Sequence, residues 1–356
     1  MKKIILSFFI VFITVQVNCI EWNLTHQLIS TTTIYDEQNK LESDLNYKPE
    51  LSVDLFTFNN NLIDTEFSYD LNLNYKNTNN NDFKITEKLY RGWLRYSTSQ
   101  AELRVGLQKI NFGPAQILRS LQWFDNINPH DPTKTTEGVK AFLGRYYFLT
   151  NANIWLWGIW GKSEETSYEQ FFTDDDSPEF GGRVQYPFKF CETAFSYHWS
   201  NNSYDNGEEN RFGFDARWDF EIGLWTEFVV SHFTNTNYKF SKSITLGADY
   251  TLSVGNGIYV LAEYLKYSKM NSNLFDETTN SNNAALSFSY PLGLFDSFSS
   301  IISFNFNDND LYNSFTYQRT YNYLSIYVNL FLNPDSNNNS SIYNDNSIQL
   351  LLKWDF

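Results

Sequence analysis

Residues Asn346 to Phe356 read NSIQLLLKWDF, and apolar side chains recur there at every second position. The alternating apolar residues are Ile348, Leu350, Leu352, Trp354 and Phe356. Polar Gln349, Lys353 and Asp355 occupy positions between them. Because successive side chains of a β-strand point to opposite faces, this spacing predicts a strand with one apolar and one polar face.

The same alternation recurs along the chain. It is clearest in segments 63–75, 180–188, 193–199, 212–220, 244–252 and 324–332. In segment 63–75, Phe67 and Tyr69 fall on one face and Glu66 and Ser68 on the other, over a length that can cross a membrane as a tilted strand. A soluble sheet also alternates, so the links between segments decide the fold class.

The links between the alternating segments are long and short in strict turn. The long links are 76–84, 110–138, 162–178, 201–210, 269–282 and 333–346. The short links are 58–61, 98–100, 149–151, 189–190, 254–256, 292–296 and 319–321. This order puts the long links on one rim and the short turns on the other, which is typical of transmembrane barrels. The sequence therefore predicts an all-β fold, a single antiparallel transmembrane β-barrel of about 16 to 18 strands, with 18 preferred.

The composition fits such a barrel. Phe, Tyr and Trp make up 19% of the chain, yet the mean hydropathy is −0.43 because polar residues such as Asn, Ser, Thr and Asp dilute them. An outward apolar band, aromatic girdles and a polar lumen together require that combination. The formal net charge is −15, and an acidic chain argues against nucleic acid as a partner.

The N-terminal residues predict a secretory signal peptide. Met1–Lys3 is a short basic head. Residues 4–15 form an almost unbroken apolar run that is too short to span a membrane as a helix. We therefore expect 1–19 to be the signal peptide and 20–356 to be the barrel.

The cysteines support export. Val17 and Cys19 occupy the small-residue positions of a cleavage site, and a lipidated Cys19 is the alternative interpretation. With Cys19 removed, Cys191 is the one cysteine left in the sequence. A lone thiol excludes an internal disulfide and a cysteine-based metal cluster.

The C-terminal segment resembles the C-terminal signature of bacterial outer-membrane β-barrel proteins. Trp354 and the terminal Phe356 lie on its apolar face. The resemblance implies that the barrel-assembly machinery reads Trp354 and Phe356 as an assembly signal. It also implies a location in the bacterial cell outer membrane, as a multi-pass β-barrel surrounded by outer-membrane lipid and lipopolysaccharide.

A second resemblance lies between positions 103 and 129. The stretch is similar to the G-x-Q-x-I-x-W-G and D-x-x-N-P motifs of several families of Gram-negative porin-like barrels, through Gly106, Gln108, Ile110, Phe112, Gly113, Asp125, Asn128 and Pro129. In those families an Arg commonly stands at the place of Leu107 and a Trp at that of Phe112. The resemblance implies a strand that turns sharply into a structured loop. Gly106 and Gly113 permit a close backbone approach or a positive φ.

The link 110–138 is the longest link and the richest in residues that pack. It carries three prolines together with Trp123, Phe124 and Arg119, whereas other links consist largely of Asn, Ser, Thr and Asp. A barrel of this size is too wide for wall side chains to fill, so its lumen holds water unless a loop obstructs it. We expect this third external loop to fold inward and narrow the pore. The alternative interpretation is a compact cap over the external rim.

Charged residues in the phase opposite the apolar residues are expected to face the lumen. The basic side of the constriction is predicted to comprise Arg91, Arg95, Arg104 and Arg145 of the wall and Arg119 of the loop; the acidic side is predicted to comprise Asp215, Asp249 and Glu263. Glu87 and Arg183 share the lumen phase. Opposed charges across a constriction sort polar solutes by sign. The alternative is that each charge is simply solvated or paired across the wall.

Catalytic residues, metal ligands and cofactors are not expected. His198 lies near Ser196 in sequence, but the surrounding motif of outer-membrane lipases is missing. His130, Asp125 and Asp131 are spaced unlike any recognised metal site. The sequence also lacks a glycine-rich phosphate loop.

These features together predict a porin-like passive diffusion channel for small hydrophilic solutes or ions, and not an enzyme. Assembly as a homotrimer is expected by analogy with porins of this size. The alternative is a surface-exposed barrel whose external loops bind ligands or host molecules without useful conductance.

Overall fold

The computed structural model describes residues 20–36, 40–77, 82–161, 177–202, 207–234, 238–271, 277–333 and 346–356. The predicted signal peptide, 1–19, lies outside these residues, as do most of the predicted links 162–178 and 333–346. All regular structure in the described residues is β-strand. No helix among them is long and apolar enough to cross a membrane.

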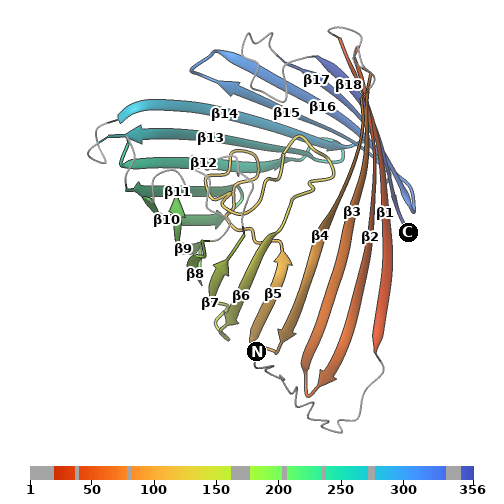
Figure 1. Ribbon diagram of the computed structural model, residues 1–356. Coiled ribbons are helices and arrows are strands. Elements are labelled where there is room, and N and C mark those ends of the chain that lie inside the picture. The colour runs from red at the N-terminus through yellow and green to blue at the C-terminus, as the bar shows by residue number, and fades with distance from the viewer. Residues whose placement is uncertain are drawn as a thin grey trace, which may run out of the picture.

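Eighteen strands make up the described chain. They are β1 (Glu21–Tyr35), β2 (Leu41–Phe58), β3 (Asn61–Asn77), β4 (Asp82–Ser97), β5 (Ala101–Gln108), β6 (Val139–Tyr147), β7 (Asn153–Ile159), β8 (Glu179–Pro187), β9 (Glu192–Asn202), β10 (Gly207–Asp219), β11 (Gly223–Phe233), β12 (Phe240–Leu252), β13 (Ile258–Met270), β14 (Glu277–Pro291), β15 (Asp296–Asn305), β16 (Asp310–Thr320), β17 (Leu324–Leu332) and β18 (Ser347–Asp355). Each strand pairs with its sequence neighbours, and Figure 1 shows them side by side around a central space. The predicted single antiparallel barrel of eighteen strands is confirmed.

The first and last strands close the barrel. β1 and β18 pair antiparallel from Gln27 opposite Asp355 to Tyr35 opposite Ser347. At the end of this seam, the backbone of His26 exchanges two hydrogen bonds with Phe356, at 2.6 and 2.9 Å. Closure leaves no unpaired sheet edge, which a barrel in lipid requires because hydrocarbon offers the backbone no hydrogen-bond partners.

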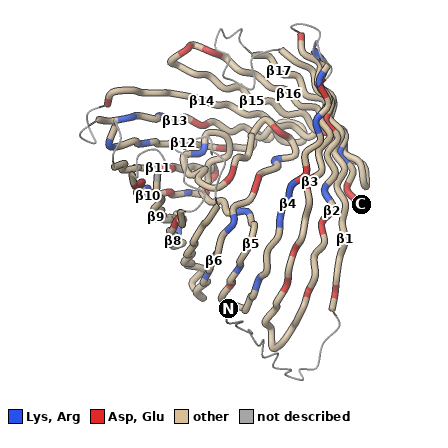
Figure 2. Tube along the Cα trace, viewed as in Figure 1, with Lys and Arg blue, Asp and Glu red and all other residues tan. Residues whose placement is uncertain are grey.

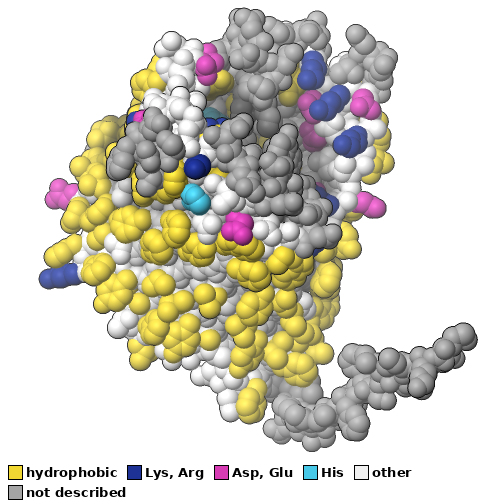
Figure 3. All heavy atoms as spheres, turned by 60° about the vertical axis from the view of Figure 1, so that its left-hand side comes forward, with side chains coloured by type: hydrophobic (Ala, Val, Ile, Leu, Met, Phe, Trp, Pro, Cys, Tyr) yellow, Lys and Arg dark blue, Asp and Glu magenta, His cyan; other side chains and the backbone are white. Residues whose placement is uncertain are grey.

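The strands turn most of their apolar residues outward and most of their charged residues inward. Outward-facing Phe195, Val328 and Leu350 are 52%, 42% and 44% exposed. Charged residues are spread along β2 to β5 (Figure 2), and their lumen-phase members lie opposite the apolar set. Figure 3 shows a broad band of hydrophobic side chains on the outer surface. A closed hydrogen-bond ladder with an apolar band on its outer surface is what a transmembrane barrel requires.

The links gather at two rims as predicted. At the short-turn rim, Asn59 and Asn60 alone join β2 to β3, and their φ values of 45° and 67° suit a two-residue type I′ hairpin turn. The opposite rim, called here the long-link rim, carries the link 109–138 between β5 and β6. Four links on that rim, 36–40, 78–81, 203–206 and 306–309, have only four or five residues and are as short as the longer turns, so link length alternates less strictly than predicted.

Several strands extend further toward the long-link rim than the sequence predicted. β3 continues to Asn77 and β4 begins at Asp82, within the predicted link 76–84. β14 begins at Glu277, within the predicted link 269–282. Backbone amides need partners whatever side chains they carry, so the ladder continues where the apolar alternation has faded.

A β-bulge reverses the phase of β4. The ladder leaves Tyr90 unpaired between Leu89 and Arg91. Because one extra residue moves the rest of the strand to the other face, Glu87 pairs with Leu71 on the apolar outer surface. The prediction that Glu87 faces the lumen is therefore wrong.

Candidate pore constriction

Residues 109–138, called here the third loop, lie inside the ring of strands (Figure 1). Their hydrogen bonds reach Glu227 on β11, Glu263 on β13 and Ser314 on β16. These strands are far from β5 and β6, which the third loop connects. The third loop therefore contacts the wall on several sides of the lumen.

Two wall carboxylates hold the first part of the third loop. Glu227 accepts hydrogen bonds from the backbone N–H groups of Ala115 and Leu121, each at 2.9 Å. Glu263 accepts three more from residues 116–118, at 2.6 to 2.9 Å. Glu227 is 0% and Glu263 3% exposed. Since hydrogen bonds to a charged acceptor are stronger than neutral ones, these five contacts fix the loop backbone to β11 and β13.

Two glycines set the path of the chain into the third loop. Gly106 has a φ of +125°, and a Cβ there would collide with the backbone of Gly92. Gly113 has a φ of +96°, and a Cβ there would collide with the carboxylate of Glu227 and press on Leu121 at 3.0 Å. The predicted need for close approach or positive φ at both glycines is confirmed.

Substitution Gly113→Ala is expected to destabilise the barrel by about 1 to 3 kcal/mol, the cost of holding a residue with a Cβ in this backbone region. The added methyl group must also displace Glu227 from the loop backbone. The midpoint of denaturant unfolding in detergent measures the effect. Gly293→Ala is the matched control, because nothing lies within 4 Å of its Cβ position. Equal midpoints for the two variants would contradict the assigned role of Gly113.

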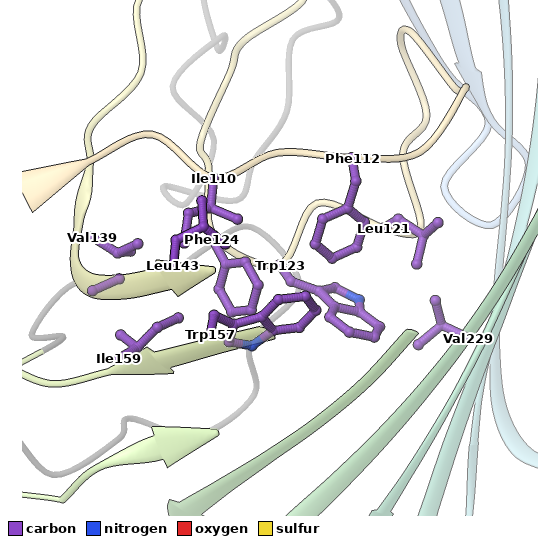
Figure 4. Close-up of a cluster of buried hydrophobic side chains, with 11 residues drawn as sticks. Ile110, Phe112, Leu121, Trp123, Phe124, Val139, Leu143, Trp157, Ile159 and Val229 are labelled. Atoms are coloured by element: carbon purple, nitrogen blue, oxygen red, sulfur yellow. The ribbon is translucent and has the colours of Figure 1, made fainter. Parts of the chain in front are cut away.

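An aromatic cluster packs the same part of the loop against the wall (Figure 4). Phe112 stacks on Trp157 of β7 with ring centroids 5.7 Å apart, and Phe124 meets Trp157 edge to face at 5.4 Å. Trp123 of the loop packs beside them and is 2% exposed. Burying each such side chain stabilises the packed loop by about 1.5 to 3 kcal/mol.

His198 belongs to this packed region. Its Nε2 lies 2.9 Å from a carboxylate oxygen of Glu179, and the indole N–H of Trp157 donates to its Nδ1 at 3.2 Å. The side chain is 1% exposed, and its ring contacts Phe124. These contacts give His198 a structural place between wall and loop.

The distal part of the third loop, residues 126–137, is called here the tip. Asp131 accepts hydrogen bonds from the N–H and hydroxyl of Thr133, at 2.8 and 2.7 Å, and from the hydroxyl of Thr135 at 3.1 Å. His130 Nδ1 lies 2.8 Å from Ser314 Oγ on β16. The tip therefore holds a compact turn that also touches the far wall.

Acid is expected to loosen the tip. Burial lowers the pKa of His130 from 6.5 to about 4. A tip released into water regains the ordinary pKa and binds more protons, so the packed tip is fully stabilised above pH 6.5 and loses that stability as the pH falls toward 4. The total loss is at most about 3 kcal/mol. We expect flicker in single-channel records to grow across this interval and His130→Gln to remove the dependence; a pH-independent wild type would contradict this.

Two polar cavities meet beside the tip. One of about 420 Å³ lies toward the long-link rim, against β1, β2, β3, β17 and β18. Another of about 490 Å³ lies toward the short-turn rim, where Asp355 and Phe356 line it. Lys48, Thr133 and Thr135 line both cavities. The two cavities therefore adjoin at Lys48.

The structure brings most of the predicted basic residues together on β4 to β6. These are Arg91, Arg95, Arg104 and Arg145. The first three line a further cavity of about 520 Å³. Arg95 forms a bidentate pair with Asp64, at 2.9 and 2.6 Å, while Arg104 and Arg145 lie 3.1 and 3.7 Å from Glu102. The basic sector is thus interleaved with acids.

Two of the predicted basic residues contact the backbone or carboxylates of the third loop. Arg91 donates to the carbonyl oxygen of Thr136 at 2.8 Å, which ties β4 to the tip. Arg119 lies in the loop and pairs with Asp125 at 2.6 and 3.0 Å. Arg119 is 6% exposed, and the carboxylate of Asp125 balances its charge.

The predicted acidic residues are occupied by partners. Asp215 accepts two hydrogen bonds from Arg183, at 2.6 and 2.9 Å, and Asp249 accepts one from the hydroxyl of Tyr259 at 2.9 Å. Glu263 holds the loop backbone. None of these three described acids lines the two cavities beside the tip, so the expected opposition of basic and acidic sides is not found there. Wall carboxylates beneath a packed loop instead satisfy its N–H groups and neighbouring cations.

Lys48 at the junction of the cavities and its partner Asp70 were not singled out from the sequence as site residues. Lys48 Nζ lies 3.8 Å from a carboxylate oxygen of Asp70 on β3, and both residues are buried. The sequence offered one clue to Lys48, which is the face of the strand on which it lies. Lys48 is the one basic residue on the lumen face of β2, whose other charged lumen residues are Glu42, Asp44, Glu50 and Asp54.

The metal-binding possibility at His130 finds no support in the described part of the chain, which contains no group of three or more His, Cys, Asp or Glu side chains placed to hold a metal ion. Asp125 pairs with Arg119, and Asp131 is bonded to its own turn. His130, Asp125 and Asp131 therefore serve other contacts.

The fold is similar to that of solved bacterial porins. Pseudomonas aeruginosa OccK5 (OpdH) matches with a TM-score of 0.60 and 12% identity, over 96% of this chain and 98% of that chain. Acinetobacter baumannii OccAB2 matches with a TM-score of 0.62 and 8% identity, over 94% and 98%. Salmonella typhi OmpF, solved in complex with daunomycin, matches with a TM-score of 0.54 and 9% identity, over 94% and 97%.

Sequence comparisons add no closer likeness. No protein-family model matches the chain, and no curated protein matches it. The likeness is therefore one of architecture, at an identity that speaks for the fold. The closed barrel, its register and its full-length match show that this chain has the fold of bacterial outer-membrane porins.

Proposed function

We propose that this protein is a passive diffusion channel of the bacterial outer membrane for small hydrophilic solutes or ions, narrowed by the third loop. The observation that carries the proposal is the pair of polar cavities beside the tip, because they extend the lumen on both sides of the loop. An eighteen-stranded barrel is too wide for its wall side chains to fill. The porin fold supports the same class of function and does not suggest an enzyme.

The proposal includes the route to the membrane. Residues 1–19 direct export, and 20–356 insert as the barrel. The barrel-assembly machinery reads Trp354 and Phe356, and the finished barrel is surrounded by outer-membrane lipid and lipopolysaccharide. The pairing of Phe356 with His26 supports this, because the terminal aromatic completes the seam. Three copies associate in the membrane.

The charged walls give the channel its electrostatic character. Arg91, Arg95 and Arg104 form the basic side with Arg145 beside them, and their shared cavity is the feature that supports this role. Arg119 neutralises the charge of Asp125 within the third loop. Asp215, Asp249 and Glu263 supply negative charge farther round the wall. Charges lining a polar lumen bias the passage of ions by sign.

Liposome swelling tests the proposed function. Residues 20–356 are refolded into liposomes, which are then diluted into isotonic solutions of neutral sugars of increasing size. We expect swelling rates that fall steeply as the sugar becomes larger, since the loop restricts the lumen. Liposomes without protein serve as the control. A refolded barrel that admits none of these sugars and no small ions would favour the alternative, a surface barrel whose external loops bind ligands.

A further inference from the structure

We infer that ions and small solutes pass the third loop between its tip and the wall of β1 to β3, and that the charge of Lys48 weakens at that point the cation preference of the surrounding carboxylates. This inference rests on the proposed channel function. It concerns a position distinct from the arginine sector predicted from the sequence.

Lys48 is placed where the two cavities adjoin. It lines both of them, and the two other residues that do so, Thr133 and Thr135, belong to the tip. A solute that moves from one cavity to the other therefore passes between Lys48 and these two threonines. The junction brings strand β2 and the tip together on opposite sides of the same gap.

The ammonium group of Lys48 is held in position. It lies 3.8 Å from Asp70 and 4.6 Å from the centre of the Tyr90 ring, and Lys48 is 8% exposed. Asn46 donates to the same carboxylate of Asp70. A cation fixed between a carboxylate and an aromatic face cannot swing away from passing ions, so its charge acts at a constant place.

The cavity on the long-link side is acidic apart from Lys48. Asp44, Asp70 and Asp131 line it, and Lys48 is the one Lys or Arg among the described residues of its lining. His130, the remaining titratable base there, is held neutral near pH 7 by burial. Approaching ions therefore meet an excess of negative charge.

The facing wall of the same cavity carries no formal charge. β1 contributes Thr31 and Thr33, and β18 contributes Gln349 and Leu351. Hydroxyl and amide groups solvate ions of either sign without sorting them. In this cavity the sign preference must therefore come from the β2 and β3 side and from Asp131 of the tip. The second cavity sets Glu50 and Asp355 against Lys134 and the shared Lys48, so the excess of acids lies in the first cavity, and we expect the channel to prefer cations.

The arginine sector lies elsewhere. Arg95 and Arg104 line a separate cavity with Asp64 and Glu66, and Lys48 is not part of its lining. A route through that cavity and a route past Lys48 therefore make different predictions for the same substitutions. This separation makes the inference testable by single changes of charge.

Reversal potentials in a salt gradient provide the first test. Lys48→Met should raise the cation-to-anion permeability ratio on the order of thirtyfold, because one charge about 4 Å from the path in water acts about fivefold on each ion and with opposite sign on cations and anions. The double variant Lys48→Met with Asp70→Asn should return the ratio to the wild-type value, because it removes the ion pair as a whole. Lys140→Met is the matched control, since Lys140 lies on the outer face of β6. An unchanged ratio in Lys48→Met would overturn the inference.

Thiol modification provides a second test that does not depend on selectivity. Residues 20–356 contain one cysteine, Cys191, so Cys191→Ser gives a background without thiols. In that background, a bulky methanethiosulfonate reagent should cut the conductance of Lys48→Cys channels and leave Lys140→Cys channels unchanged. Channels that conduct normally after confirmed modification at position 48 would overturn the inference.

The outcomes separate the inference from the function on which it rests. A wild-type barrel that does not conduct removes both. The third possible result is a barrel that conducts, whose conductance does not change on substitution of Lys48 but falls on modification of Arg95→Cys. This result would support the channel function and would place the route in the arginine sector.

Discussion

Replacing Glu227 and Glu263 together by alanine is expected to release the third loop and to widen the channel. The double variant leaves five loop N–H groups without their carboxylate acceptors, those of Ala115 and Leu121 buried and those of residues 116–118 half-buried. A buried donor without a partner costs about 1 to 3 kcal/mol, so the packed loop should lose on the order of 5 kcal/mol or more. Local stability of that size separates a loop that stays packed from one that opens often.

Single-channel conductance and sugar permeation report the release. The double variant should show higher and noisier conductance than the wild type, and its liposomes should admit larger sugars. Glu227→Gln with Glu263→Gln keeps one carbonyl acceptor per side chain and should show a smaller effect. Glu221→Ala removes an exposed turn carboxylate and is the matched control. Wild-type conductance and sugar limits in the alanine double variant would show that the third loop does not restrict the channel.

Replacing Arg91, Arg95 and Arg104 by glutamine should shift ion preference toward cations. The three guanidinium groups line one cavity with Asp64, Glu66 and Lys109, and their removal leaves Lys109 as the one cation against two carboxylates in its described lining. Each charge acts at roughly 0.5 kcal/mol on an ion across about 8 Å of water, and with opposite sign on cations and anions, so three together change the cation-to-anion ratio on the order of a hundredfold at low salt. The direction follows from sign alone, since the substitution removes positive charge only.

The reversal potential in a potassium chloride gradient measures this shift. Arg319→Gln is the matched control, because Arg319 pairs with Ile326 on the outer-facing side of the ladder. The triple variant also breaks the contact of Arg91 with Thr136 of the tip, so its conductance is compared with that of Arg95→Gln alone. A reversal potential equal to that of the wild type would show that the arginine sector does not contribute to the ion preference of the channel.

The barrel itself was predictable because two periodic signals coincide. Alternation such as that of Leu350, Leu352 and Trp354 gives the face of each strand, and the order of long and short links gives the rims. Both are local properties that a single sequence displays. The strand ends were less predictable, because the ladder between Lys76 and Asp82 is held by backbone bonds that leave no trace in side-chain pattern.

The alternation of side chains predicts the wrong face of a strand where a β-bulge adds one residue. The bulge at Tyr90 turns Glu87 outward although its spacing from Arg91 is even. Nothing in the local sequence marks Tyr90 as the extra residue. A bulge arises from the fit of β3 to β4, so it is a property of the pair of strands.

The sequence identified most charged residues of the site, but not the residues that they contact. Arg95, Arg104 and Arg145 do gather, because neighbouring strands carry them in the same phase. Glu263 was identified as a lumen acid, but its bonds to residues 116–118 join positions far apart in the chain. Lys48 carried a clue in being the one cation on its lumen face, yet its importance depends on where the tip lies.

A planar-bilayer recording of refolded residues 20–356 tests the central claim most directly. A closed barrel with water beside its third loop predicts steady conductance that is linear in voltage and proportional to salt concentration. A correctly folded, inserted barrel that gives only closed traces would contradict the account.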